Sequence, residues 1–144
     1  MELPAKRAAE LLRKSYSQDE LFDIYELGKL WLESGQHRRA EAIMNGLNEV
    51  ASDFAPAWLG TAFLRSISGN YEGVLNAAKQ ALRIAPESIE AMLYIVTAAL
   101  ALKDLSTAGT YLGEVGERIE QGGVSNPHVS RFFKMQLARY QNRG

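Results

Sequence analysis

Residues 55–88 read APAWLGTAFLRSISGNYEGVLNAAKQALRIAPES. Two helices are predicted here, 55–68 and 71–84, because a Gly69-Asn70 turn separates them and Pro86 follows the second. Gly35 precedes Gly69 by 34 residues. Apolar residues recur at the same interval in the second helix of each pair: Ala40, Val74 and Ala108. A fixed period of this length is typical of stacked helical repeats.

Three helix pairs follow this period, at about 21–54, 55–88 and 89–122. Their helices are predicted at 18–33 and 37–50, 55–68 and 71–84, and 88–102 and 105–120. The first helix begins at a capping box, in which Ser17 is the N-cap and Glu20 reaches back to it. The tetratricopeptide pattern W-x2-L-G-x2-Y…A-x3-F is matched in the first pair by Ile24, Leu27, Gly28, Trp31, Ala40 and Met44. The sequence therefore predicts three tetratricopeptide repeats.

Two further helices are predicted outside the repeats. Residues 4–14 form a short amphipathic helix whose apolar stripe, Ala8, Leu11 and Leu12, is too narrow to be stable alone, so it must dock on the repeats or on another chain. Asn126 and Pro127 begin a helix at 127–141 that covers the open end of the third repeat. The predicted fold is all-α and forms one domain, 1–144. It is a right-handed superhelix of three repeats with an extra N-terminal helix and a C-terminal capping helix.

The overall composition argues against several classes of function. The formal net charge is −1, so no general positive field would attract nucleic acid. The chain has no cysteine, which excludes disulfides and thiol catalysis. No apolar run in the sequence has the length of a signal peptide or a membrane span. We therefore expect a cytoplasmic protein that does not insert into membranes.

Residues of the kinds used in catalysis are few and scattered. His37 and His128 are isolated, and each is expected to be a solvated or capping residue. No spacing of His, Cys or carboxylate residues fits a metal site. Glycines occur at turns and helix contacts rather than in a phosphate-binding loop after a strand. We expect no enzymatic activity, no metal and no cofactor.

In stacked repeats the first helix of each pair lines a concave groove. The repeat register places twelve residues on the groove side: Phe22, Tyr25, Lys29, Leu32, Leu59, Phe63, Ser66, Ile67, Leu93, Tyr94, Thr97 and Leu100. Each could instead lie in the core, and for Leu93 and Leu100 the two interpretations are equally supported. The predicted partner-binding residues are Phe22, Tyr25, Lys29, Leu32, Leu59, Phe63, Ile67 and Tyr94.

The side chains of this predicted groove indicate the kind of ligand. Lys29 is its only cation, whereas a groove that holds a terminal carboxylate needs clustered Lys, Arg and Asn residues. An apolar, aromatic groove instead suits an extended protein segment with a few hydrophobic anchors, each contributing roughly 1.5–3 kcal/mol when buried. Two or three such anchors would give a complex that forms readily and can still be released.

The chain resembles the class II translocator chaperones of bacterial type III secretion systems over about residues 20–120. The similarity is best at 21–35 (LFDIYELGKLWLESG) and at 58–72 (WLGTAFLRSISGNYE). In the second stretch, Leu59-Gly60, Arg65 and Gly69-x-Tyr71 resemble the second repeat of that family. Arg65, which stands where the general repeat has an aromatic residue, is then a feature of the family.

The resemblance implies a small cytosolic chaperone. Its groove would bind a Pro-spaced apolar segment near the N-terminus of a secreted, membrane-inserting translocator and keep that protein soluble before export. The residues in this role would be Tyr25, Leu32, Leu59 and Phe63. The resemblance also implies homodimerisation through the N-terminal helix, with Ala8, Leu11 and Leu12 as the possible contacts.

Two other interpretations stay open. The repeats could form a structural scaffold or assembly adaptor, for example one that holds a needle subunit or another component of the secretion apparatus. An enzyme or a nucleic-acid binder is the third interpretation, and the composition and motifs described above argue against it.

Overall fold

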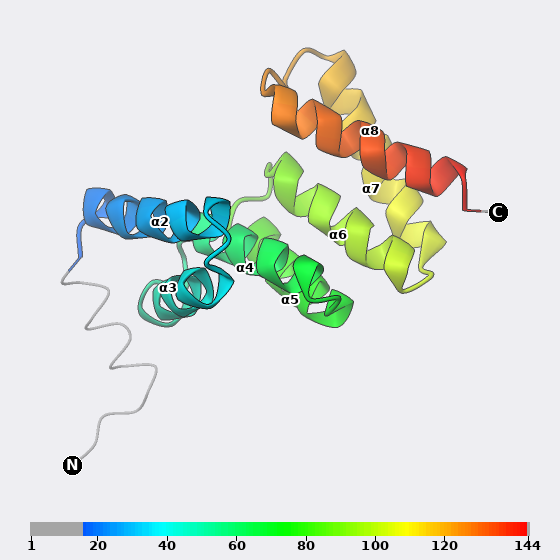
Figure 1. Ribbon diagram of the computed structural model, residues 1–144. Helices are drawn as coiled ribbons and strands as arrows, with labels where there is room; N and C mark the ends of the chain where they lie inside the picture. The colour runs from blue at the N-terminus through cyan, green and yellow to red at the C-terminus, as the bar shows by residue number, and fades with distance from the viewer. Residues whose placement is uncertain (1–15, 144) are drawn as a thin grey trace.

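The computed structural model describes residues 16–143, which form seven helices. They are α2 (Gln18–Glu33), α3 (His37–Val50), α4 (Ala55–Ile67), α5 (Tyr71–Ile84), α6 (Ile89–Ala101), α7 (Leu105–Glu120) and α8 (Pro127–Gln141) (Figure 1). These bounds agree with the predicted ranges to within one residue at each end. The helix expected at 4–14, with Ala8, Leu11 and Leu12, lies outside the described residues.

The helices begin at local signals that the sequence carries. At the start of α2, the Glu20 N–H donates to Ser17 Oγ (3.1 Å) and the Ser17 N–H donates to a Glu20 carboxylate oxygen (3.0 Å). These two bonds complete the predicted capping box and satisfy two backbone donors that the helix leaves unpaired. Side-chain oxygens of Asn70, Ser88 and Asp104 accept backbone N–H bonds at the starts of α5, α6 and α7.

The turn inside each helix pair contains a residue with a left-handed backbone. Gly35 (φ 78°) and Gly69 (φ 75°) hold this position in the first two pairs, and Lys103 (φ 65°) holds it in the third. The three positions are 34 residues apart and are therefore equivalent in the repeat. The left-handed conformation costs a residue with a Cβ atom roughly 1–2 kcal/mol, whereas glycine adopts it freely.

Lys103→Gly is therefore expected to stabilise the protein. Glycine removes the backbone strain but adds freedom to the unfolded chain, so the expected net gain in the free energy of unfolding is about 0.5–1 kcal/mol. Urea denaturation followed by circular dichroism measures this difference. The reciprocal control is Gly69→Lys, which should lower the free energy of unfolding by a similar amount. A loss of stability in Lys103→Gly would contradict the equivalence of the three turns.

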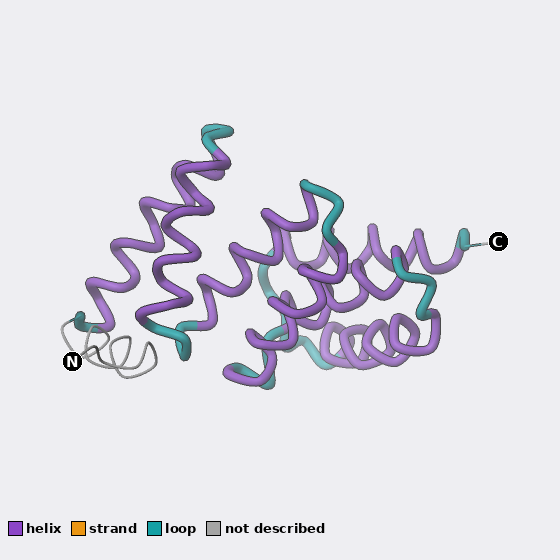
Figure 2. Tube along the Cα trace, turned by 90° about the horizontal axis from the view of Figure 1, so that it is seen from below, coloured by secondary structure: helices purple, strands orange, loops and turns teal. Residues whose placement is uncertain are grey.

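The helices form a stack of hairpins: α2 with α3, α4 with α5, and α6 with α7. Each hairpin packs on the next, through α3 and α4 and through α5 and α6. The first helices of the pairs also touch, because α4 contacts both α2 and α6, and α8 contacts α6 and α7. Figure 2 shows the short loops that join these helices. The helices α2, α4, α6 and α8 therefore follow one another along one side of the stack.

Two glycines allow α2, α3 and α4 to approach closely. A Cβ atom on Gly28 would lie 2.9 Å from Ile43 Cγ2 and from Met44 Cε, and one on Gly60 would lie 2.7 Å from Met44 Sδ. These distances are shorter than van der Waals contact, so any larger residue would displace its neighbours. The fully buried Met44 side chain of α3 thus lies against both α2 and α4 and sets the distance between them.

The core is most complete around α6. Leu93 and Leu100, which could have been core or groove residues, are both buried, so the structure places them in the core. Thr97 is buried as well, and its hydroxyl donates to the Leu93 carbonyl (2.9 Å). Leu27, which matches the repeat pattern, is not part of the core, since this side chain is 46% exposed. Within residues 16–143, α2 is the first helix, and no helix packs on its outer side.

The C-terminal helix α8 covers the third hairpin. Val129 is buried against residues of α6 and α7, and Phe133, Leu137 and Tyr140 pack on the same two helices. Phe132 lies nearer the first helices and packs edge to face against Tyr94 of α6, with ring centroids 5.0 Å apart. One face of α8 therefore completes the core, and an adjacent face continues the row of first helices.

Candidate functional site

Six of the eight predicted partner-binding residues lie around one open pocket, which we call the groove pocket. They are Tyr25, Lys29 and Leu32 of α2, Leu59 and Phe63 of α4, and Tyr94 of α6. The lining is completed by Glu33, Gly60 and Glu90. The groove pocket has a volume of about 240 Å³ and is open to solvent. The first helices of all three hairpins therefore contribute to a single depression.

The other two predicted residues, Phe22 and Ile67, do not line the groove pocket. Phe22 is 43% exposed and packs edge to face against Phe54, with ring centroids 5.0 Å apart. Ile67 is 49% exposed and lines a different pocket with residues of α3, among them His37 and Glu41. Two steps of four residues along a helix turn the side chain by about 80°. Ile67 is therefore directed away from the face that carries Leu59.

The groove pocket combines an apolar interior with charged residues at its edge. Burial raises the pKa of both Tyr25 and Tyr94, and the negative charge of Glu90 raises these pKa values further. Both phenols are therefore neutral at physiological pH and offer an apolar ring with a hydroxyl group that can donate or accept. The charged side chains Lys29 and Glu33 are exposed, as is Glu90. Such a surface suits apolar anchors on a segment with a polar backbone.

Sequence reasoning missed Glu33, Gly60 and Glu90. The two glutamates lie four residues from predicted groove residues, Glu33 after Lys29 and Glu90 before Tyr94. Residues at this spacing share a helix face, so the register could have included them. Gly60 belongs to the pocket for a different reason. Its missing side chain lets Met44 of α3 lie against α4, and this contact could not be predicted without the packing of α3.

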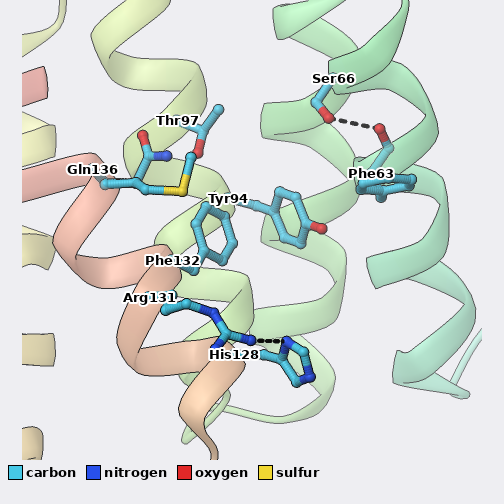
Figure 3. Close-up of a pocket in the computed structure, with 9 residues that line it drawn as sticks. Phe63, Ser66, Tyr94, Thr97, His128, Arg131, Phe132 and Gln136 are labelled. Atoms are coloured by element: carbon cyan, nitrogen blue, oxygen red, sulfur yellow. Dashed lines mark hydrogen bonds between the residues drawn. The ribbon is translucent and has the colours of Figure 1, made fainter.

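A second, larger pocket adjoins the first, and we call it the α8 pocket (Figure 3). Its lining consists of Phe63 and Ser66 of α4, Tyr94 and Thr97 of α6, and His128, Arg131, Phe132, Met135 and Gln136 of α8. The volume is about 390 Å³. Phe63 and Tyr94 line both pockets, so the two depressions form one continuous surface from α2 to α8. The repeat register placed Phe63, Ser66, Tyr94 and Thr97 on the groove side, but the sequence did not predict the contribution of α8, which was assigned to capping alone.

Arg65, which departs from the general repeat pattern, has a structural role. Its guanidinium Nη1 donates to the Gly73 carbonyl at 3.0 Å, and its aliphatic stem occupies the space beside Gly73, where a Cβ atom would lie 2.6 Å from Arg65 Cδ. The Gly73 N–H donates to Asn70, the N-cap of α5. Arg65 thus joins the end of α4 to the first turn of α5. The resemblance marked Arg65 as a family feature but did not give it this role.

The two histidines are exposed, in agreement with the sequence prediction. Arg131 Nη2 donates to His128 Nδ1 at 2.7 Å, while His37 lies at the start of α3. Within residues 16–143, no group of three or more His, Cys, Asp or Glu side chains could hold a metal ion. In the same part of the chain, no helix combines the length and the apolar character needed to cross a bilayer.

No protein-family model and no curated protein sequence matches the chain. Solved structures do match it. The Yersinia enterocolitica type III secretion chaperone SycD, in complex with a peptide of the translocator YopD, is similar with a TM-score of 0.73 and 16% identity, over 88% of this chain and 94% of SycD. The TPR2AB domain of yeast Sti1, in a complex with Hsp90, gives a TM-score of 0.77 and 16% identity, over 95% of this chain and 51% of that structure. The chain has a tetratricopeptide-repeat fold.

The structural similarity to translocator chaperones is confirmed in several structures. PcrH in complex with the chaperone-binding region of PopD gives a TM-score of 0.71 and 20% identity, over 89% of this chain and 93% of PcrH. The structure of SycD in an alternative dimer gives a TM-score of 0.73 and 16% identity, over 88% of this chain and 93% of SycD. At such low identities the similarity concerns the fold. Sti1 has the same tetratricopeptide-repeat fold, so the fold alone does not identify the partner of this chain.

Proposed function

We propose that this tetratricopeptide-repeat protein is a cytoplasmic chaperone for a secreted partner. It would hold an extended apolar segment of that partner in the groove pocket and keep the partner soluble before type III secretion. The observation that carries the proposal is the groove pocket itself, where three consecutive first helices present Tyr25, Leu59 and Tyr94 to one open depression. A surface of this kind accepts apolar side chains from several positions of an extended segment.

The comparisons support the proposal at the level of the fold. SycD is in complex with a peptide of the translocator YopD, and PcrH is in complex with the chaperone-binding region of PopD. Both match nearly nine tenths of this chain. Phe63 supports the proposal independently, since it is 40% exposed at the junction of two pockets. Ligand anchors would cover this ring and gain the free energy of removing it from water.

A photocrosslinking experiment in the native host tests the proposal. Replacing Phe63 with p-benzoylphenylalanine places a reactive group in the groove, and mass spectrometry then identifies the crosslinked segment. We expect one apolar segment of a secreted, membrane-active protein, and no such product when the same group replaces the equally exposed Leu102 at the end of α6. A needle subunit or an apparatus component as the product would instead support the scaffold alternative. A secreted partner crosslinked equally from both positions would contradict the groove assignment.

The proposed homodimer leads to a separate prediction. Its possible contacts are the apolar residues Ala8, Leu11 and Leu12. SycD has been solved as a dimer. If this stripe holds two copies together, the double variant Leu11→Glu, Leu12→Glu should halve the mass measured by light scattering, because buried carboxylates oppose association. Leu102→Glu is the control and should leave the mass unchanged. An unchanged mass in the double variant would rule out a dimer through this stripe.

A further inference from the structure

The α8 pocket differs from the groove pocket in its charge. Glu33 and Glu90 outnumber Lys29 around the groove pocket, whereas Arg131 is the charged residue of the α8 pocket and no acidic residue lines it. Arg131 uses one of its guanidinium N–H groups on His128 Nδ1 (2.7 Å). A guanidinium has five such donors, so the others can bind a carboxylate. The two ends of the continuous surface therefore favour opposite charges on a ligand.

The walls of the α8 pocket are apolar and partly uncovered. Met135 is 63% exposed and Phe63 is 40% exposed, although both are large apolar side chains. The edge-to-face contact of Phe132 with Tyr94 holds both rings at the pocket wall (Figure 3). An apolar side chain of a ligand that enters here would remove several of these surfaces from water.

Gln136 provides an independent sign of a ligand. Its side chain is only 3% exposed, yet its Oε1 has no hydrogen-bond partner among the described residues. Figure 3 shows the amide of Gln136 beside Thr97 in the lining of the pocket. A buried polar group without a partner destabilises the folded state and calls for an explanation. The last torsion of a glutamine is soft, so the amide can turn to offer its donor or its acceptor to a peptide backbone.

We propose that the α8 pocket is a second binding site for the same extended segment, which takes an apolar side chain flanked by an acidic residue. The apolar side chain would lie against Phe63, Phe132 and Met135, the carboxylate would bind Arg131, and the amide of Gln136 would pair with the backbone of the segment. This inference rests on the proposed function. It adds which end of the segment carries the acidic residue, since that residue lies at the α8 end and away from Glu33 and Glu90.

A peptide selection with the full-length protein tests the proposed function and the role of the α8 pocket separately. The probe is a phage library of random twelve-residue peptides, displayed with the C-terminal end of each peptide fused so that no terminal carboxylate is free. The wild-type protein should enrich peptides with spaced apolar residues and an Asp or Glu on one fixed side of them. Arg131→Gln should keep the apolar preference and lose the acidic one. Arg139→Gln, an exposed residue of α8 outside the pocket, is the matched control and should keep both preferences.

One enriched peptide then allows a quantitative comparison. The wild-type protein should bind it about three- to tenfold more tightly than its Asp→Asn or Glu→Gln analogue, while Arg131→Gln should bind the two equally. Gln136→Leu should weaken binding by a similar factor and leave the melting temperature unchanged or higher, because it removes a buried unpaired amide. Gln141→Leu, at the exposed end of α8, should change neither quantity.

The possible failures are distinguishable. Enrichment of apolar peptides without an acidic residue would overturn this inference and leave the groove proposal intact. Enrichment of no peptide at all would overturn both. A Gln136→Leu variant that melts at a lower temperature and binds like the wild type would make Gln136 a structural residue and overturn its role in binding.

Discussion

Phe63→Glu is expected to abolish capture of the partner segment and to leave the fold intact. Phe63 lies in both the groove pocket and the α8 pocket, so its ring would contact anchors on either side. Loss of a buried aromatic contact costs roughly 1.5–3 kcal/mol, and a carboxylate facing an apolar anchor adds a desolvation penalty. Together these effects correspond to a loss of affinity of about a hundredfold or more. Because the ring is 40% exposed, the folded state loses little.

Pull-down and fluorescence anisotropy with the crosslinked partner segment would measure this loss. Far-UV circular dichroism and thermal melting should stay close to wild type. Leu102→Glu is the matched control, since Leu102 is also 40% exposed and lies outside both pockets. Tyr25→Ala should also abolish capture, but Tyr25 packs against Phe54 (ring centroids 6.0 Å apart), so this variant should also lose stability. Undiminished capture by Phe63→Glu would show that the groove is not the binding surface.

Gly28→Leu is expected to have the largest effect on stability. The first carbon of any side chain at this position would already lie 2.9 Å from Ile43 Cγ2 and Met44 Cε. A leucine would therefore force α2 away from α3, and overpacking of this kind costs typically about 1–3 kcal/mol. Urea denaturation measures the change in the free energy of unfolding. Combining it with Met44→Ala should cost less than the sum of the two single variants, because the smaller side chain leaves room for the leucine.

The control for this prediction is Gly46→Leu in α3. A Cβ atom at Gly46 would meet nothing within 4 Å, and the residue is exposed in the interior of a helix. Leucine forms helices better than glycine by nearly 1 kcal/mol, so this variant should be as stable as the wild type or more stable. If Gly28→Leu and Gly46→Leu had equal effects, the close approach of α2 and α3 would not depend on Gly28.

The helix ranges could be predicted closely because they depend on local signals. Ser17 with Glu20, the turns at Gly35 and Gly69, and Asn126 before Pro127 each act within a few residues of the helix end that they define. The groove residues Tyr25, Leu59 and Phe63 could be predicted too, since the repeat period fixes which side of a helix meets the next first helix. Their role in binding stays a prediction.

What could not be predicted depends on contacts between distant residues. The exposure of Leu27 follows from the absence of a described helix outside α2, which no local pattern records. The α8 pocket depends on α8 lying beside α6, and Gln136 belongs to it through that contact alone. Lys103 stands where the first two turns have glycine. Its left-handed backbone follows from the 34-residue period, whereas its residue type argues against that conformation.

The contacts between hairpins have a mechanical consequence. Among the described helices, the backbones of α2 and α3 do not come close to those of α6, α7 and α8, so the first and third hairpins are held together mainly through the second. Without a bound segment, the first and third hairpins are therefore expected to bend independently about the second. A segment lying from Tyr25 to Arg131 would tie both ends to one strand of polypeptide. The protein with a bound segment should then be stiffer than the free protein and should unfold as a unit. Single-molecule force measurements should show one unfolding event at a higher force.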